Sequence, residues 1–214
     1  LETHCMPIIS ASQEPSYFAL FQNRVFLKLW LGQVITYGGD ALTRIALPIL
    51  VYQQTGSPLV LGAMFAIQML PWIVWAPWVG VLVDRFNRKR LIVAGAVLEG
   101  ASVAILALLP LSLPAIYGLA LVGSMAQVVY NQARSAVMPD VVGRALYSRA
   151  VAVSTITLQI LDVAGALIGG FLVAWLGARA VLSIDAATFL VNALTILTVT
   201  LPTVAKPVRE PWLR

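Results

Sequence analysis

The chain has 214 residues, of which 60% are hydrophobic and only 11% are charged. An ordinary soluble domain carries about 25% charged residues, so this composition excludes a water-soluble fold. The formal net charge of +5 would suit a nucleic-acid-binding protein, but the basic residues gather at the ends of apolar segments. There they indicate membrane topology, and their expected contact is the lipid bilayer rather than nucleic acid.

Six apolar segments follow one another, separated by short stretches of Gly, Pro and polar residues. A helix needs about 20 mostly apolar residues to cross the hydrocarbon core, and loops or open strands cannot cross it without unpaired backbone groups. The sequence therefore predicts an all-α membrane protein of six transmembrane helices. We expect them near residues 26–51, 59–83, 91–109, 114–138, 151–176 and 180–201. Residues 1–25 are expected to form a cytoplasmic N-terminal segment, 26–201 the bundle, and 202–214 a cytoplasmic tail or the start of a central linker.

The basic residues also predict the orientation, because short loops rich in Lys and Arg stay in the cytoplasm. With the N-terminus inside, twelve of the 14 basic residues fall on the inner side; Arg179 lies outside and Arg44 within the first span. The pattern predicts a multi-pass protein of a bacterial-type plasma membrane with both termini in the cytoplasm. The loop positions expected outside are Ser57, Ser112 and Ala178, and those expected inside are Asn87, Gly143 and Lys206.

The most specific motif lies between the second and third predicted helices. It resembles the signature Gly-x-Leu-x-Asp-Arg-x-Gly-Arg-Lys/Arg of the major facilitator superfamily at the same place. Asn87 stands where the family has Gly, and Asn also accepts a left-handed backbone. The resemblance implies a cytoplasmic gate between the two halves of a transporter; the alternative is an ordinary basic loop. The matching residues are Gly80, Leu82, Asp84, Arg85, Arg88 and Lys89.

The resemblance extends from residue 21 to about residue 201 and is closest to the efflux branch that contains macrolide and siderophore exporters. Stretches within residues 29–57 and 177–190 carry it. Such proteins have twelve helices, so the resemblance implies the N-terminal six-helix half. The family's fourth-helix arginine, normally well inside the membrane, is not matched, and Arg134 sits at the inner end of that helix instead.

The fifth predicted helix carries an antiporter-like motif. The family signature Gly-Pro-x-x-Gly-Gly appears with Ala166 in place of Pro, which weakens the antiport interpretation. A helix-packing face of small residues is an equal alternative. The glycines concerned are Gly165, Gly169 and Gly170.

A weak internal repeat supports the same architecture. At an offset of 90 residues, Arg44 aligns with Arg134 and Gly80 aligns with Gly170. The second copy lacks Asp84 and most of the bases, as expected of a copy that lies on the outer side. These features predict a 3+3 inverted repeat, which is half of a twelve-helix major-facilitator fold.

Ionisable residues inside the spans are the candidates for proton coupling or for the cavity wall, because a charge in hydrocarbon normally faces a partner or water. Asp40 and Arg44 are four residues apart on one helix face, in the favourable order for a pair. Arg44 and Asp185 are predicted at equal depth, so we expect Asp185 to share Arg44 with Asp40. Asp162 has no basic neighbour within one turn and is the preferred proton-coupling group. The five candidates are Asp40, Arg44, Glu99, Asp162 and Asp185.

The sequence thus predicts half of a secondary active transporter, with proton-coupled efflux of a small apolar or amphipathic compound by alternating access. A C-terminal six-helix half or a second copy of the chain would close the substrate path. The alternative is a truncated, non-transporting membrane fragment or assembly partner that needs a second half. No span carries a nucleophile–base pair or a metal-ligand spacing, so neither an enzyme nor a metal or cofactor site is expected.

Overall fold

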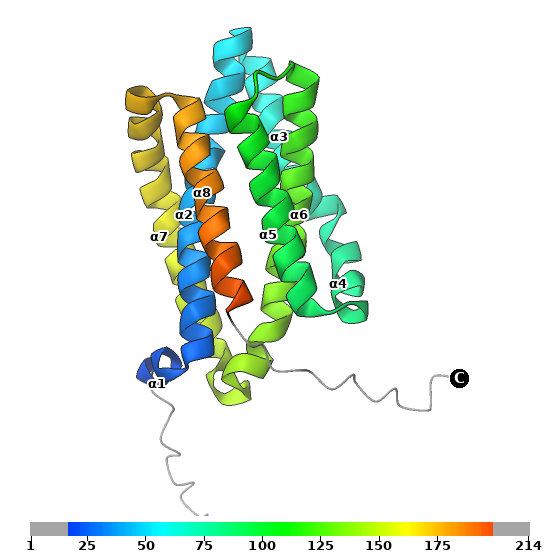
Figure 1. The fold of residues 1–214 in the computed structure, drawn as a ribbon, viewed down its shortest axis with the longest axis vertical. Helices are drawn as coiled ribbons and strands as arrows, with labels where there is room; N and C mark the ends of the chain where they lie inside the picture. Colours follow the sequence, from blue (N-terminus) through cyan, green and yellow to red (C-terminus); the bar gives the residue numbers. More distant parts are fainter. Residues whose placement is uncertain (1–16, 199–214) are drawn as a thin grey trace, which may run out of the picture.

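The computed structural model describes residues 17–198, which fold into a bundle of helices (Figure 1). Five of these helices are long and apolar enough to cross a membrane, and there are six spans if the bent pair α3 and α4 counts as one. This confirms the all-helical, six-span fold for the described residues. In chain order the helices are α1 (Tyr17–Gln22), α2 (Arg24–Thr55), α3 (Pro58–Val74), α4 (Ala76–Arg85), α5 (Arg88–Leu108), α6 (Leu113–Val142), α7 (Arg144–Leu176) and α8 (Ala178–Leu197).

Several helices are longer than the predicted spans. Helix α7 begins at Arg144 rather than at residue 151, and α6 continues to Val142 rather than stopping at 138. Hydropathy marks only the part of a helix that lies in hydrocarbon, whereas backbone hydrogen bonding continues into polar turns. The predicted tail, residues 202–214 with Lys206, lies outside the described residues, as do residues 1–16 of the predicted N-terminal segment.

The second predicted span is broken near its middle. Helix α3 ends at Val74, α4 begins at Ala76, and the two are bent by 48°. Pro77 lies in the first turn of α4, where its missing N–H and its ring prevent a regular helix from continuing through it. Pro71, by contrast, lies inside α3, which continues past it.

The helix connections gather at the two ends of the bundle. The α2–α3, α5–α6 and α7–α8 connections lie at the upper end in Figure 1, whereas α1 and the α4–α5 and α6–α7 connections lie at the lower end. The loops predicted on one side of the membrane therefore share one end of the bundle.

Gly56 ends α2 with φ 64°, a left-handed conformation that glycine adopts without steric cost. Its N–H donates to the Tyr52 carbonyl at 2.7 Å.

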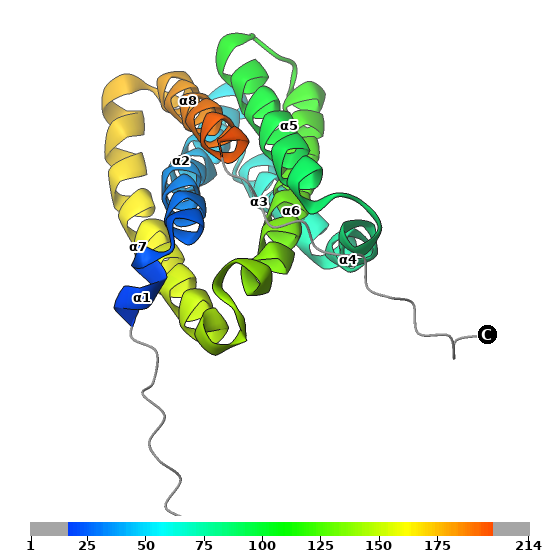
Figure 2. The same ribbon diagram turned by 60° about the horizontal axis from the view of Figure 1, so that its bottom comes forward.

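Close helix crossings fix the interior. Helix α8 packs against both α2 and α5, while α7 packs on α2 and α6 packs on α5 (Figure 2). Glycines allow these approaches: a Cβ at Gly95 of α5 would lie 3.0 Å from the backbone of Tyr130 in α6, and one at Gly100 would lie 2.7 Å from the Cβ of Phe189 in α8. Such short separations place polar side chains of neighbouring helices within hydrogen-bonding reach.

Candidate functional site

A pocket of about 400 Å³ lies between α2, α3, α5 and α6 and brings together polar and ionisable residues from all four helices. Two of the predicted acids, Asp40 from α2 and Glu99 from α5, line it. Arg44 lines it as well, whereas Asp162 and Asp185 are not among its lining residues. The structure therefore brings together three of the five candidates.

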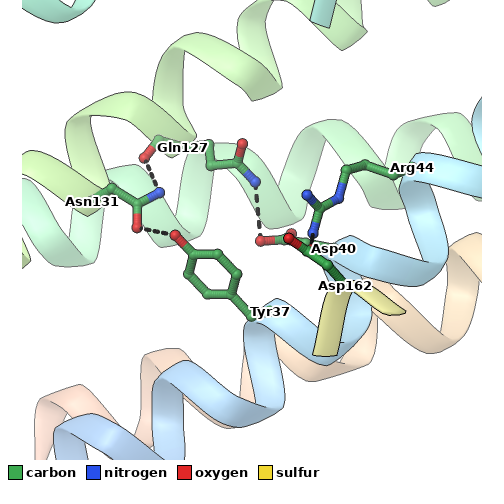
Figure 3. Close-up of polar contacts among 6 residues, drawn as sticks. All are labelled: Tyr37, Asp40, Arg44, Gln127, Asn131 and Asp162. Atoms are coloured by element: carbon green, nitrogen blue, oxygen red, sulfur yellow. Dashed lines mark hydrogen bonds and ion pairs between the residues drawn. The ribbon is translucent and has the colours of Figure 1, made fainter. Parts of the chain in front are cut away.

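Asp40 is 6% exposed and accepts a hydrogen bond from the Gln127 side-chain amide of α6 at 3.0 Å. One turn away, the Tyr37 hydroxyl donates to the Asn131 amide oxygen at 2.6 Å, and the Asn131 amide donates to the Gln127 carbonyl at 2.9 Å. Figure 3 shows these contacts as one continuous polar connection between α2 and α6. Gln127 and Asn131 were not among the five candidates from the sequence, because a lone amide in a span usually serves helix packing.

Glu99 is 4% exposed, and its Oε2 has no hydrogen-bond partner among the described residues. Gln68, on the α3 side of the same pocket, has a buried amide nitrogen that also lacks a partner. In the part of the chain that the structure describes, neither Asp40 nor Glu99 forms an ion pair. The pocket thus holds two buried carboxyl groups without a cation in direct contact.

Arg44 forms its ion pair with Asp162 of α7 (Figure 3). This contradicts two predictions: Asp162 is not unpaired, and Arg44 is not shared between Asp40 and Asp185. The prediction for Asp162 considered only bases within one turn of its own helix, whereas the partner comes from another helix. The side chains of the pair are 47% and 41% exposed, so they form a surface-accessible bridge between α2 and α7.

Asp185 of α8 is fully buried and binds hydroxyl groups instead of a base. It accepts hydrogen bonds from Thr43 of α2 and, at 3.1 Å, from Thr188 of its own helix. A Cβ at Gly39 of α2 would collide with the Asp185 carboxyl group, so the glycine makes room for it. The geometry assigns Asp185 to the α2–α8 interface.

The gate motif spans the lower end of the bundle. Asn87 is the N-cap of α5, with φ −68° and a side chain that accepts from the Arg90 N–H at 3.2 Å, so it is not in the left-handed conformation expected of the family's Gly. Arg88 donates to the Asp140 carboxylate at 2.8 Å and to the Ala136 carbonyl at 2.9 Å, both in α6. The sequence had not singled out Asp140. The other gate residues are Gly80, Asp84 and Arg85 in α4, and Lys89 in α5.

The antiporter-like glycines differ in their surroundings. A Cβ at Gly165 would collide with Ala41 of α2, and one at Gly169 would lie 3.5 Å from Ile45. At Gly170 an added Cβ meets nothing within 4 Å. Two of the three glycines therefore face α2, as a packing surface of small residues requires.

A second pocket, of about 250 Å³, is lined mainly by α2, α6 and α7 and contains Arg134. Tyr37 and Trp72 line this pocket and the larger one, so the two adjoin. Sequence reasoning had placed Arg134 at the inner end of its helix, but periodicity gave no sign that the side chain is buried. Among the described residues no group of three or more His, Cys, Asp or Glu side chains is placed to hold a metal ion.

Comparison with known proteins agrees with this architecture. The sequence model of the Major Facilitator Superfamily matches residues 29–213. Macrolide efflux protein A of Streptococcus pyogenes is 31% identical over 81 residues, which are 38% of this chain and 20% of that protein. The uncharacterized MFS-type transporter YfiS of Bacillus subtilis (strain 168) is 29% identical over 177 residues, which are 81% of this chain and 42% of the relative. The chain thus spans less than half the length of these relatives.

Proposed function

Because this chain belongs to the major facilitator superfamily, a family of transporters rather than enzymes, we propose that it forms one half of a proton-coupled exporter. Its substrate would be a small apolar or amphipathic compound, moved by alternating access. The efflux assignment is supported by the similarity to a protein named for macrolide efflux. The multi-pass helical bundle supplies one wall of a substrate path.

The observation that carries proton coupling is the pair of buried carboxyl groups in the larger pocket. Asp40 and Glu99 are 6% and 4% exposed, and one oxygen of Glu99 has no hydrogen-bond partner among the described residues. An uncompensated charge inside a membrane protein is costly, and a proton can neutralise a carboxylate where no cation is in contact. Gln127 can donate to a charged Asp40, so the pocket can accommodate a change of protonation.

The proposal also includes the orientation of the chain in the membrane and the source of the second wall of the substrate path. The lower end of the bundle carries the basic gate residues, including Arg85 and Arg88, and would face the cytoplasm of a bacterial-type plasma membrane by the positive-inside rule. A C-terminal six-helix half or a second copy of this chain would supply the opposite wall. If neither combination transports, the chain is instead a non-transporting fragment or assembly partner.

The test measures uptake of two labelled amphipathic compounds, a macrolide and an aromatic carboxylate, into everted membrane vesicles with an imposed proton gradient. The chain is expressed alone and together with a C-terminal six-helix half. We expect the unmodified chain to show uptake driven by the proton gradient. Glu99→Gln should abolish this uptake, because the amide side chain cannot bind and release a proton near neutral pH as a carboxyl group can. Ser102→Ala is the matched control, since Ser102 lines the same pocket on the same helix and donates only to the Leu98 carbonyl at 2.8 Å.

Two results would contradict the proposal. If uptake by the Glu99→Gln variant still depends on the proton gradient, Glu99 is not required for proton coupling. Absence of uptake in both expressed forms, with the protein present in the membrane at normal abundance, would favour the non-transporting alternative.

A further inference from the structure

The smaller pocket contains a buried cation. Arg134 of α6 is 6% exposed, and its Nε and Nη2 have no hydrogen-bond partner among the described residues. Two other arginines in the described part of the chain contact acids: Arg44 contacts Asp162 and Arg88 contacts Asp140. Arg134 therefore has buried donor groups facing a pocket without a counter-charge.

Burial of a guanidinium group in this way is costly unless an anion compensates it. The group is planar and offers paired N–H donors, which match the two oxygens of a carboxylate. A second polar group of the same pocket is also unsatisfied: the Ser154 hydroxyl of α7 is buried and has no hydrogen-bond partner within residues 17–198. Donors from two helices thus converge on one space of about 250 Å³.

The remaining lining of the pocket combines six apolar or aromatic side chains with four polar ones, Gln33, Asn131, Ser135 and Thr155. Trp72 of α3, Met138 of α6 and Leu158 of α7 belong to its apolar part. A ligand that satisfies both parts of the pocket needs an anionic head and an apolar body. A purely apolar compound would leave the Arg134 donors unpaired, and a small inorganic ion would leave the apolar part empty.

We propose that this pocket binds the acid group of a small amphipathic anion, with Arg134 and Ser154 as donors and Trp72 against the apolar body. The site rests on the proposed export function and narrows its substrate to amphipathic carboxylates. Because Tyr37 lines both pockets, a ligand held here lies beside the Tyr37–Asn131 hydrogen bond next to Asp40. Substrate and the proposed proton site would then be neighbours.

An anionic head that could bind Arg134 occurs both in free solutes and in the phosphate groups of lipids. We assign the site to a free solute because the guanidinium group is buried rather than at the rim of the bundle. The test therefore uses the full chain in nanodiscs of purely zwitterionic lipid, and in matched discs that contain phosphatidylglycerol.

Binding of 1-naphthoate and of its neutral analogue 1-naphthamide is measured by calorimetry. The chain has six tryptophans, so a Trp72→Phe variant, in which the ligand-induced quenching of tryptophan fluorescence should be smaller, reports whether the ligand binds beside Trp72. We expect naphthoate to bind roughly tenfold or more tightly than naphthamide, since charge-assisted bidentate contacts are worth about that factor or more. Arg134→Gln should abolish the preference, and Arg134→Lys should restore part of it. Arg179→Gln is the control, because Arg179 donates to the Leu109 carbonyl at 3.0 Å in the upper connection.

Ser154→Leu provides a second variant that keeps Arg134 and fills the pocket, so it should also abolish naphthoate binding. Equal binding of the two ligands by the unmodified chain, or an unchanged preference in either Arg134→Gln or Ser154→Leu, would overturn the site. Competition by phosphatidylglycerol would overturn its assignment to a free solute. None of these binding results depends on transport. The binding-site proposal can therefore be wrong while proton-coupled export is right, and export can be wrong while the binding site is right.

Discussion

Arg44 and Asp162, 118 residues apart in the chain, form an ion pair that joins α2 to α7. The pair changes the role that the sequence suggested for Asp162. A carboxylate held by a guanidinium group is already compensated, so it is a poor candidate for a group that must gain and lose a proton. Asp40 and Glu99 are better candidates than Asp162 for the proton-coupling group, because they have no such partner among the described residues.

The first prediction concerns this pair. Asp162→Asn and Arg44→Gln should each lower the thermal stability of the chain in detergent, because each leaves one charge without its partner. Both residues lie within membrane spans, where less water screens a charge pair, so we expect a double-mutant cycle to give a coupling free energy of at least about 0.5 kcal/mol. Strictly additive losses would show that the pair contributes nothing.

The second prediction is topological. With the lone native cysteine replaced, single cysteines at Ser57 and Ser112 should react with an impermeant maleimide added to whole cells. Ala178, the third position predicted outside, is 3% exposed and is therefore not used as a labelling site. Cysteines at Asn87 and Arg144 should react only after the membrane is opened, because the lower end carries most of the basic residues. Labelling of Asn87 from outside would reverse the orientation and remove the basis for placing the gate in the cytoplasm.

The third prediction separates the glycines of the antiporter-like motif. Gly165→Ala should destabilise the chain by about 1–3 kcal/mol, the usual cost of overpacking, because its added Cβ would collide with Ala41 of α2. Gly170→Ala is the matched control on the same helix, where an added Cβ meets nothing within 4 Å. The measurement is the midpoint of thermal unfolding for both variants.

Equal midpoints for the two variants would show that Gly165 does not form a tight contact with α2. A loss of transport in Gly170→Ala without a loss of stability would instead favour a role in antiport over simple helix packing.

The sequence predicted the number of spans and their approximate limits because hydrocarbon imposes a length and a polarity on each crossing. The predicted span 59–83 did not include the break between α3 and α4, which falls beside Pro77, a residue that cannot continue a regular helix. The lengths of α6 and α7 beyond the membrane were underestimated, because their polar turns have no hydropathy signal.

Partners of the charged residues were much harder to predict. Depth along a helix can be estimated from the sequence, and it suggested that Arg44 meets Asp185. Depth does not fix the rotation of each helix, however, and the structure pairs Arg44 with Asp162 while Asp185 binds Thr43. The burial of Arg134 also depends on how α2, α6 and α7 surround it, and hydropathy carries no information about that arrangement.

The last prediction concerns the contact between the gate motif and α6. Arg88 donates to the Asp140 carboxylate at 2.8 Å and to the Ala136 carbonyl at 2.9 Å, and its side chain is 28% exposed. Arg88→Gln should lower the free energy of unfolding by about 1–2 kcal/mol, because hydrogen bonds to charged groups contribute about 1.5–3 kcal/mol and this partly exposed pair should contribute less. Arg88→Lys keeps the charge but not the fork of donors, so it should recover only part of the loss.

Arg90→Gln is the control for the loss of a basic residue from the same turn, since its side chain is exposed and the Asn87 cap binds only its backbone N–H. Asp140→Asn should reproduce most of the effect of Arg88→Gln, and the double variant should be little worse than either single one. If Arg90→Gln destabilises the chain as much as Arg88→Gln, the effect comes from the net charge of the turn. The specific contact between α5 and α6 would then not be what holds the gate in place.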